Sequence, residues 1–249
     1  MIKNESLNDL VLYLEHDNVY TLGKNSNSDH ILPSSPPNIE IIQKEEVRVA
    51  KITLNNETFR TEAGAMYYMR GNITMESKAP SVGGFLKAAI SGESIFRPTY
   101  SGTGELYLEP TAYGIHTMDL KGETWILENG SYYGSEMGVA VDVHREKALT
   151  AFKSGEGFLD FQTKISGNGK VLVKAPGPVE EVKLENDKLV VDGTFAFART
   201  ASINYSCERS SKSIIGSATS GEGMVRVYQG TGTVLMSPFT FYSARVLGF

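Results

Sequence analysis

The chain has 249 residues and a formal net charge of −5, with 41% hydrophobic and 21% charged residues. This composition excludes a largely disordered chain and supplies enough apolar surface for a real core. The acidic balance, without a long run of basic residues, argues against nucleic-acid binding. The single cysteine, Cys207, excludes an internal disulfide and a cysteine-rich metal site, and it fits a reducing compartment.

The amino-terminal residues predict an extension and a linker. The apolar stretch Leu10–Leu14 is too short for a signal sequence, and no stretch approaches the ~18 apolar residues of a membrane span. We therefore expect a soluble cytoplasmic protein. Residues 1–38 end in a segment rich in proline and serine. Residues 7–14 fit a helix, and the alternative is a strand over Leu10–Leu14 paired with Val19–Leu22. A single domain is expected over residues 39–249.

Two glycine-containing motifs recur along this domain. Ser-Gly-Glu occurs three times, 63 and 66 residues apart, at 91–93, 154–156 and 220–222. Each copy is followed by a Gly-x-Gly, at 102–104, 167–169 and 230–232. An apolar triplet and then a proline follow each Gly-x-Gly. Because four features recur in one order three times, the sequence predicts an internal triplication with units of about 65 residues.

A second module keeps a similar spacing, and its copies begin at Glu57, Glu123 and Asp187. Counting from Ser-Gly-Glu leaves a half-unit at each end of the domain. We therefore expect Ser220–Pro238 to pair with Val47–Met75, which would close a pseudo-threefold arrangement without exposed edges. The competing prediction is that Phe239–Phe249 completes the third unit by itself.

The local pattern is typical of β-structure, since Tyr, Phe, Val, Ile and Thr dominate short segments separated by Gly, Asn and Pro. The predicted fold class is all-β, with triplicated double-stranded β-helix or sandwich units and few short helices, such as residues 85–90. The Gly-x-Gly motifs predict turns with positive φ. Hairpin turns are predicted at Asn55-Asn56, Lys121-Gly122 and Asn186-Asp187. Trp125 aligns with Phe59 and Leu189, so we expect it to be buried.

The sequence resembles a known family over roughly residues 45–240. The segments that carry the resemblance are Gly64–Glu76, Gly84–Lys87, Ser91–Phe96 and Gly102–Pro110. In combination they resemble the mitochondrial-inheritance family of conserved uncharacterised proteins. This resemblance implies a fold like that of the tryptophan RNA-binding attenuator protein, with short double-stranded β-helical units triplicated in one chain. It implies no reaction.

The polar residues predict no catalytic residue, cofactor or metal site. The four histidines lack partners at metal-ligand spacing, and neither a nucleophile elbow nor a complete phosphate-binding loop is present. Glu93, Glu156 and Glu222 of the Ser-Gly-Glu motifs are the candidates for a ligand-binding site. If they converge on the axis, they would bind a cation or a cationic group, whereas the alternative is that each caps its own turn.

These observations predict a non-enzymatic β-rich scaffold or interaction module with an unknown protein partner. A catalytic site needs several unlike groups to converge, and the polar positions here are either repeated or isolated. The alternative is a small-ligand-binding protein with a site near the pseudo-threefold axis. The aligned repeat positions lack the basic and aromatic residues that RNA binding requires, and the sequence allows a homo-oligomer.

Overall fold

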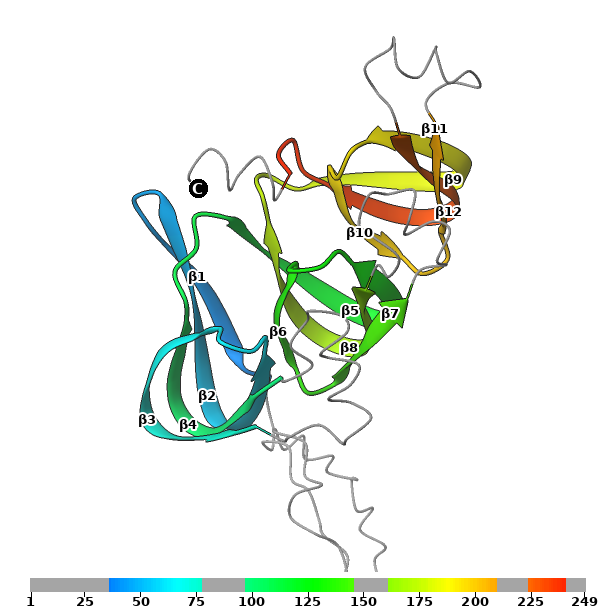
Figure 1. Cartoon of the computed structure of the whole chain (residues 1–249). Helices are drawn as coiled ribbons and strands as arrows, with labels where there is room; N and C mark the ends of the chain where they lie inside the picture. Colours follow the sequence, from blue (N-terminus) through cyan, green and yellow to red (C-terminus); the bar gives the residue numbers. More distant parts are fainter. Residues whose placement is uncertain (1–35, 78–96, 146–160, 210–223, 241–249) are drawn as a thin grey trace, which may run out of the picture. The chain divides into compact units, whose positions relative to one another are not determined.

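The computed structural model describes residues 36–77, 97–145, 161–209 and 224–240 (Figure 1). The elements of these residues are twelve strands, β1 to β12, which pair antiparallel in one sheet, and no helix occurs among them. The all-β prediction is therefore confirmed. The expected helical turns at 85–90 and the choice between helix and hairpin near the amino terminus fall outside the described residues.

The first group of strands forms around a central strand. It comprises β1 (Asn38–Lys44), β2 (Val47–Thr61), β3 (Met66–Glu76) and β4 (Thr99–Leu108). β4 pairs with β2 and with β3, and β1 pairs with β2. The inward side chains of β2 and β4 form a core around the fully buried Phe59 and Leu106.

A related arrangement occurs twice more along the chain, without a counterpart of β1 and with two shorter strands in place of β3. The second group comprises β5 (Gly114–Leu127), β6 (Tyr132–Glu136), β7 (Val139–Arg145) and β8 (Phe161–Ala175). The third comprises β9 (Glu180–Asp192), β10 (Ala196–Thr200), β11 (Asn204–Arg209) and β12 (Met224–Met236). β8 pairs with β5, β6 and β7, and β12 pairs with β9, β10 and β11. Each of these two groups has a core of its own.

The dipeptides expected to form hairpin turns lie inside long strands, so that prediction is wrong. Asn56, Gly122 and Asn186 have φ values of 60°, 101° and 53°, and the pairing register shifts beside each of them. They are β-bulges, and the Gly-x-Gly motifs lie opposite them in the central strands. The positive φ predicted for these glycines is confirmed, but the predicted turns are wrong, because the motifs lie within β4, β8 and β12. Asn and Gly favour positive φ in bulges and in hairpin turns alike, so sequence cannot separate the two.

The expected pairing of two half-units is not what the registers show. β12, which lies within Ser220–Pro238, pairs with β9, β10 and β11, whereas β2 and β3, within Val47–Met75, pair with β4. Each strand group already contains both sequence modules, first the one that begins at an acidic residue and then Gly-x-Gly. A repeat count that starts at Ser-Gly-Glu begins between the two modules of a strand group. It therefore leaves one module over at each end of the domain, and these two modules are not half-units of a shared group.

Neighbouring strand groups are joined edge to edge by β6 and β10. β6 pairs with β8 and also, over Gly134–Glu136, with Phe59–Thr61 of β2. β10 pairs with β12 and also, over Ala198–Thr200, with Trp125–Leu127 of β5. A closed threefold arrangement would need a third junction, between β9 and β3, which the described strands do not make.

Trp125 is half-buried, so the prediction that it is buried in the core is confirmed only in part. It packs against the core of the second group but faces Thr200, the last paired residue of β10. The aligned Phe59 is fully buried, and Leu189 is half-buried. Sequence alignment therefore identified the strand position of Trp125, but not its place at the margin of a junction.

Candidate functional site

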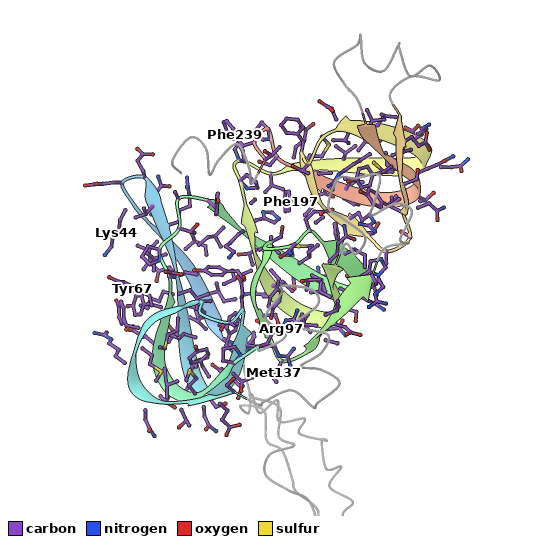
Figure 2. The ribbon with its side chains drawn as sticks, in the orientation of Figure 1. Lys44, Tyr67, Arg97, Met137, Phe197 and Phe239 are labelled. Carbon is purple, nitrogen blue, oxygen red and sulfur yellow. The ribbon has the colours of Figure 1, made fainter. Side chains whose placement is uncertain are left out.

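Strand β3 is exposed along nearly its whole length and lies at one end of the strand order. Ile73 packs against the core, whereas the other large apolar side chains of β3 are 37–57% exposed. These belong to Met66, Tyr67, Tyr68, Met69 and Met75, which we call the β3 surface. Figure 2 shows Tyr67 on the outer side of the ribbon. Among the described strands, β3 pairs only with β4. An apolar edge strand of this kind is a template for pairing with another polypeptide.

Aromatic contacts hold the side chains of the β3 surface in place. The ring of Tyr68 stacks on that of Tyr107 of β4, with centroids 4.3 Å apart and an interplanar angle of 17°. Tyr67 meets Tyr68 edge to face at 5.1 Å. Because these rings are positioned by one another, the surface presents rigid apolar area with polar hydroxyl tips, as tyrosine does at many interfaces.

An ion-pair network fixes β3 to the rest of the first group. Glu105 of β4 lies 2.9 Å from Nζ of Lys51 of β2, and it accepts a hydrogen bond from Nε of Arg70 of β3. The hydroxyl of Tyr107 donates to the same carboxylate at 3.2 Å. The hydrogen bonds from Lys51 and Arg70 lower the pKa of Glu105 to about 2. One carboxylate therefore links three adjacent strands.

Stability should depend on this carboxylate in acid. Because the pKa of Glu105 is about 2 in the folded protein and 4.5 is its ordinary value, its stabilising effect is present above pH 4.5 and is lost as the pH falls toward 2. We expect Glu105→Gln to lower the urea midpoint at about pH 6 and to leave it nearly unchanged at about pH 2. Glu46→Gln, at an exposed position between β1 and β2, is the control. If Glu105→Gln lowers the urea midpoint by the same amount at both pH values, this role of Glu105 is contradicted.

A basic cavity lies beside the second junction. Its volume is about 540 Å³, and its basic lining residues are His144, Lys164 and Arg199. Arg199 is buried, its Nη1 donates to Oε1 of Gln162 at 3.1 Å, and its guanidinium lies 4.7 Å from the ring centre of Tyr205. The described lining residues include no carboxylate. The chemistry of the cavity suits an anionic group.

The structure does not test the candidates that the sequence proposed. Glu93, Glu156 and Glu222 lie outside the described residues, so both their convergence and their capping role stay predictions. Among the described residues, no group of three or more His, Cys, Asp or Glu side chains is placed to hold a metal. Cys207 is a buried residue of β11.

Sequence analysis missed the β3 surface, although a signal was present. Tyr67 aligns with Tyr133 of the second group, which is buried, so the alignment gives no sign that Tyr67 is exposed. The missed signal is the density of large apolar residues at positions 66–69, which exceeds that of the equivalent short segments.

The described part of the chain is therefore an all-β protein built from three antiparallel strand groups, with an apolar edge strand. The family described as Mitochondrial biogenesis AIM24 matches residues 39–239, and the chain belongs to this family, which confirms the resemblance found in the sequence. No curated protein shows significant similarity to the chain.

A solved structure supports the fold. The crystal structure of a protein from Streptococcus pyogenes is similar with a TM-score of 0.65 and 21% sequence identity, over 85% of this chain and 97% of that chain. At this identity the likeness concerns the fold. Within the described residues, no helix has the length and apolar character needed to cross a membrane.

Proposed function

We propose that the protein is a non-enzymatic β-rich scaffold and that its β3 surface binds another polypeptide. The observation that carries this proposal is the contrast between β3 and its counterparts. The described side chains of Tyr132–Ser135 in β6 and Ala196–Arg199 in β10 are at most 4% exposed, whereas those of Met66–Met69 are at least 37% exposed. The counterparts are buried by pairing with a neighbouring group, and β3 has no such cover among the described strands.

The proposal includes an internal triplication of double-stranded β-helical units. Its support is a register shift that recurs at one position, between Met66 and Tyr68 of β3, Tyr132 and Gly134 of β6, and Ala196 and Ala198 of β10. A feature repeated this closely indicates that β3 occupies the place of β6 and β10 in its own unit. Binding at β3 would then use main-chain hydrogen bonds for affinity and the apolar side chains for specificity.

The test removes the apolar rings without altering the strand. We expect the double variant Tyr67→Ser and Tyr68→Ser to lose proteins that the immobilised wild-type chain retains from a lysate of its source cells. The variant should stay folded, because both side chains are exposed and the lost ring stacking is worth about 0.5–1.5 kcal/mol. Met137→Ser, at another exposed apolar residue, is the matched control. Retention of the same proteins by the double variant would reject the proposal.

Small-ligand binding stays the alternative function. The basic cavity is one candidate site for such a ligand, and Glu93, Glu156 and Glu222 are the candidates proposed from the sequence. The cytoplasm remains our proposed location, although the description of the family concerns mitochondrial biogenesis.

A further inference from the structure

The two junctions between strand groups use one register. In the first, Phe59–Thr61 of β2 face Gly134–Glu136 of β6 in antiparallel order. In the second, Trp125–Leu127 of β5 face Ala198–Thr200 of β10 in the same way. Each junction thus pairs the end of a long strand of one group, β2 or β5, with a short strand of the next group.

A main-chain hydrogen bond continues each junction at the equivalent residue. The amide of Glu62 donates to the carbonyl of Tyr133 at 3.0 Å, and the amide of Glu128 donates to the carbonyl of Phe197 at 2.8 Å. Figure 2 shows Phe197 where the second and third groups meet. The repeated geometry therefore defines both the register and the extent of a junction.

The registers on the central strands identify the two halves of a third junction. The residue opposite the first glycine of Gly-x-Gly is Glu57 in the first group and Asp187 in the third. Counting on from these residues, Leu189–Val191 of β9 take the place of Phe59–Thr61. Tyr68–Arg70 of β3 follow the same register shift that precedes β6 residues 134–136.

Both halves of this third junction are exposed in one chain. Val190 is 52% exposed, whereas its counterpart Ile126 is 3% exposed. On the other side, Met69 is 37% exposed, and its counterpart Arg199 is 4% exposed. Among the described strands, these segments of β9 and β3 pair only with their own central strands, β12 and β4. The chain thus carries two complementary edges that both lack the cover seen at the other two junctions.

We propose that β9 of one molecule pairs with β3 of a second copy of this chain. The register is that of the two internal junctions, with Leu189 opposite Arg70, Val190 opposite Met69 and Val191 opposite Tyr68. The amide of Asp192 then donates to the carbonyl of Tyr67. This inference rests on the proposed function, since it names the partner of the β3 surface.

A second copy of this chain fits the two edges, because β9 is equivalent to β2 and β5, and β3 is equivalent to β6 and β10. These are the strands that pair with each other in the two internal junctions. The contact joins two different surfaces, so it is head-to-tail, and repeated contacts of this kind give a ring if the rotation closes and a filament if it does not. Each added chain buries one β3 surface and leaves one new β3 edge at the end.

The first test places a lysine on either half of the contact. We expect the mass of the wild-type protein, measured by light scattering after gel filtration, to rise above that of one chain with concentration. Met69→Lys and Val190→Lys should each be monomeric, because the ammonium group would lose its hydration against an apolar side chain. The arginines at the equivalent positions of the two internal junctions keep hydrogen bonds, Arg199 to Gln162 and Arg60 to the carbonyl of Val139. An equimolar mixture of the two variants should give a dimer, since each variant keeps the edge that the other has lost. Met137→Lys and Val47→Lys, at exposed apolar residues outside both edges, should associate like the wild type.

The second test is a cross-link that depends on the register. Residues directly opposite in an antiparallel pair have Cα atoms ~4.5–5.5 Å apart, within reach of a disulfide. The double variant Met69→Cys and Val190→Cys should give a ladder of multimers on a non-reducing gel, and reduction should return it to one chain. Met75→Cys with Val190→Cys should give no ladder, and the native Cys207 is buried.

Three results would overturn the inference. They are a wild-type mass of one chain at every concentration, a mixture of the lysine variants that stays monomeric, and a cross-link confined to a single chain, which would mean closure within one molecule. The Tyr67 and Tyr68 double variant separates this failure from that of the proposed function. If the wild type is monomeric but the double variant still loses a captured protein, the β3 surface binds a different partner.

Discussion

Gly102→Ala should destabilise the protein by more than about 4 kcal/mol, beyond the range of most single substitutions. Gly102 has a φ of +133°, and a Cβ atom there would lie 2.1 Å from the carbonyl oxygen of Asn72 in β3. The clash is with backbone, so no side-chain rotation relieves it. β3 would have to separate from β4, and the pairing of these two strands would be lost.

Gly122→Ala is the matched control for this substitution. Gly122 also has positive φ, +101°, but apart from its chain neighbours no residue has an atom within 4 Å of the position that a Cβ would take. Alanine there should cost only the backbone strain of about 1–2 kcal/mol. Urea unfolding of the two variants separates strain from steric clash. Equal losses would show that β3 does not approach β4 closely at Gly102.

The all-β class and the repeat spacing could be predicted from the sequence because both depend on local chemistry. β-branched and aromatic segments with regularly placed glycines favour strands whatever their partners are. The same local character led to the wrong prediction of hairpin turns at Asn56 and Gly122. There a residue with positive φ looks like a hairpin turn, and only the opposing strand decides that it is a bulge.

The exposure of the β3 surface could not be predicted in this way. Tyr67 occupies the position of Tyr133, and the two residues are chemically identical, yet one is 57% exposed and the other is 3% exposed. The difference comes from a strand of a neighbouring group that covers Tyr133. Repeat alignment predicts equivalent positions, but burial depends on the partners that surround each position. An unequal environment at equivalent residues is therefore informative about binding.

Glu128→Gln should cost about 3–5 kcal/mol of stability, because Glu128 belongs to a buried cluster of charged and polar groups. Its Oε1 accepts hydrogen bonds from Nη1 of Arg226 at 3.1 Å and from Nε2 of Gln162 at 2.7 Å. Oε1 of Gln162 in turn accepts from Nη1 of Arg199 at 3.1 Å. Glu128 and Gln162 belong to the second strand group, and the two arginines belong to the third. The cluster therefore joins the groups beside their main-chain junction.

The magnitude follows from the burial of the cluster. The side chains of Arg226 and Glu128 are 3% and 13% exposed, so solvent screens their attraction weakly. Burial of Arg226 costs desolvation free energy, and the attraction to the Glu128 carboxylate compensates for this cost. Glu128→Gln removes the negative charge, so the cost is no longer compensated. Replacement of both partners, as in Glu128→Leu with Arg226→Met, should cost less than the sum of the single changes.

Glu62→Gln is the matched control, since Glu62 follows β2 where Glu128 follows β5. Glu62 forms an ion pair with Lys174 at 2.7 Å, but its side chain is 34% exposed and that of Lys174 is 20% exposed. A pair of this exposure should contribute no more than about 1 kcal/mol. Urea unfolding at neutral pH compares the two variants directly. If Glu62→Gln and Glu128→Gln lower the free energy of unfolding equally, burial does not govern these junctions, and the cluster around Glu128 is not what holds the second and third groups together.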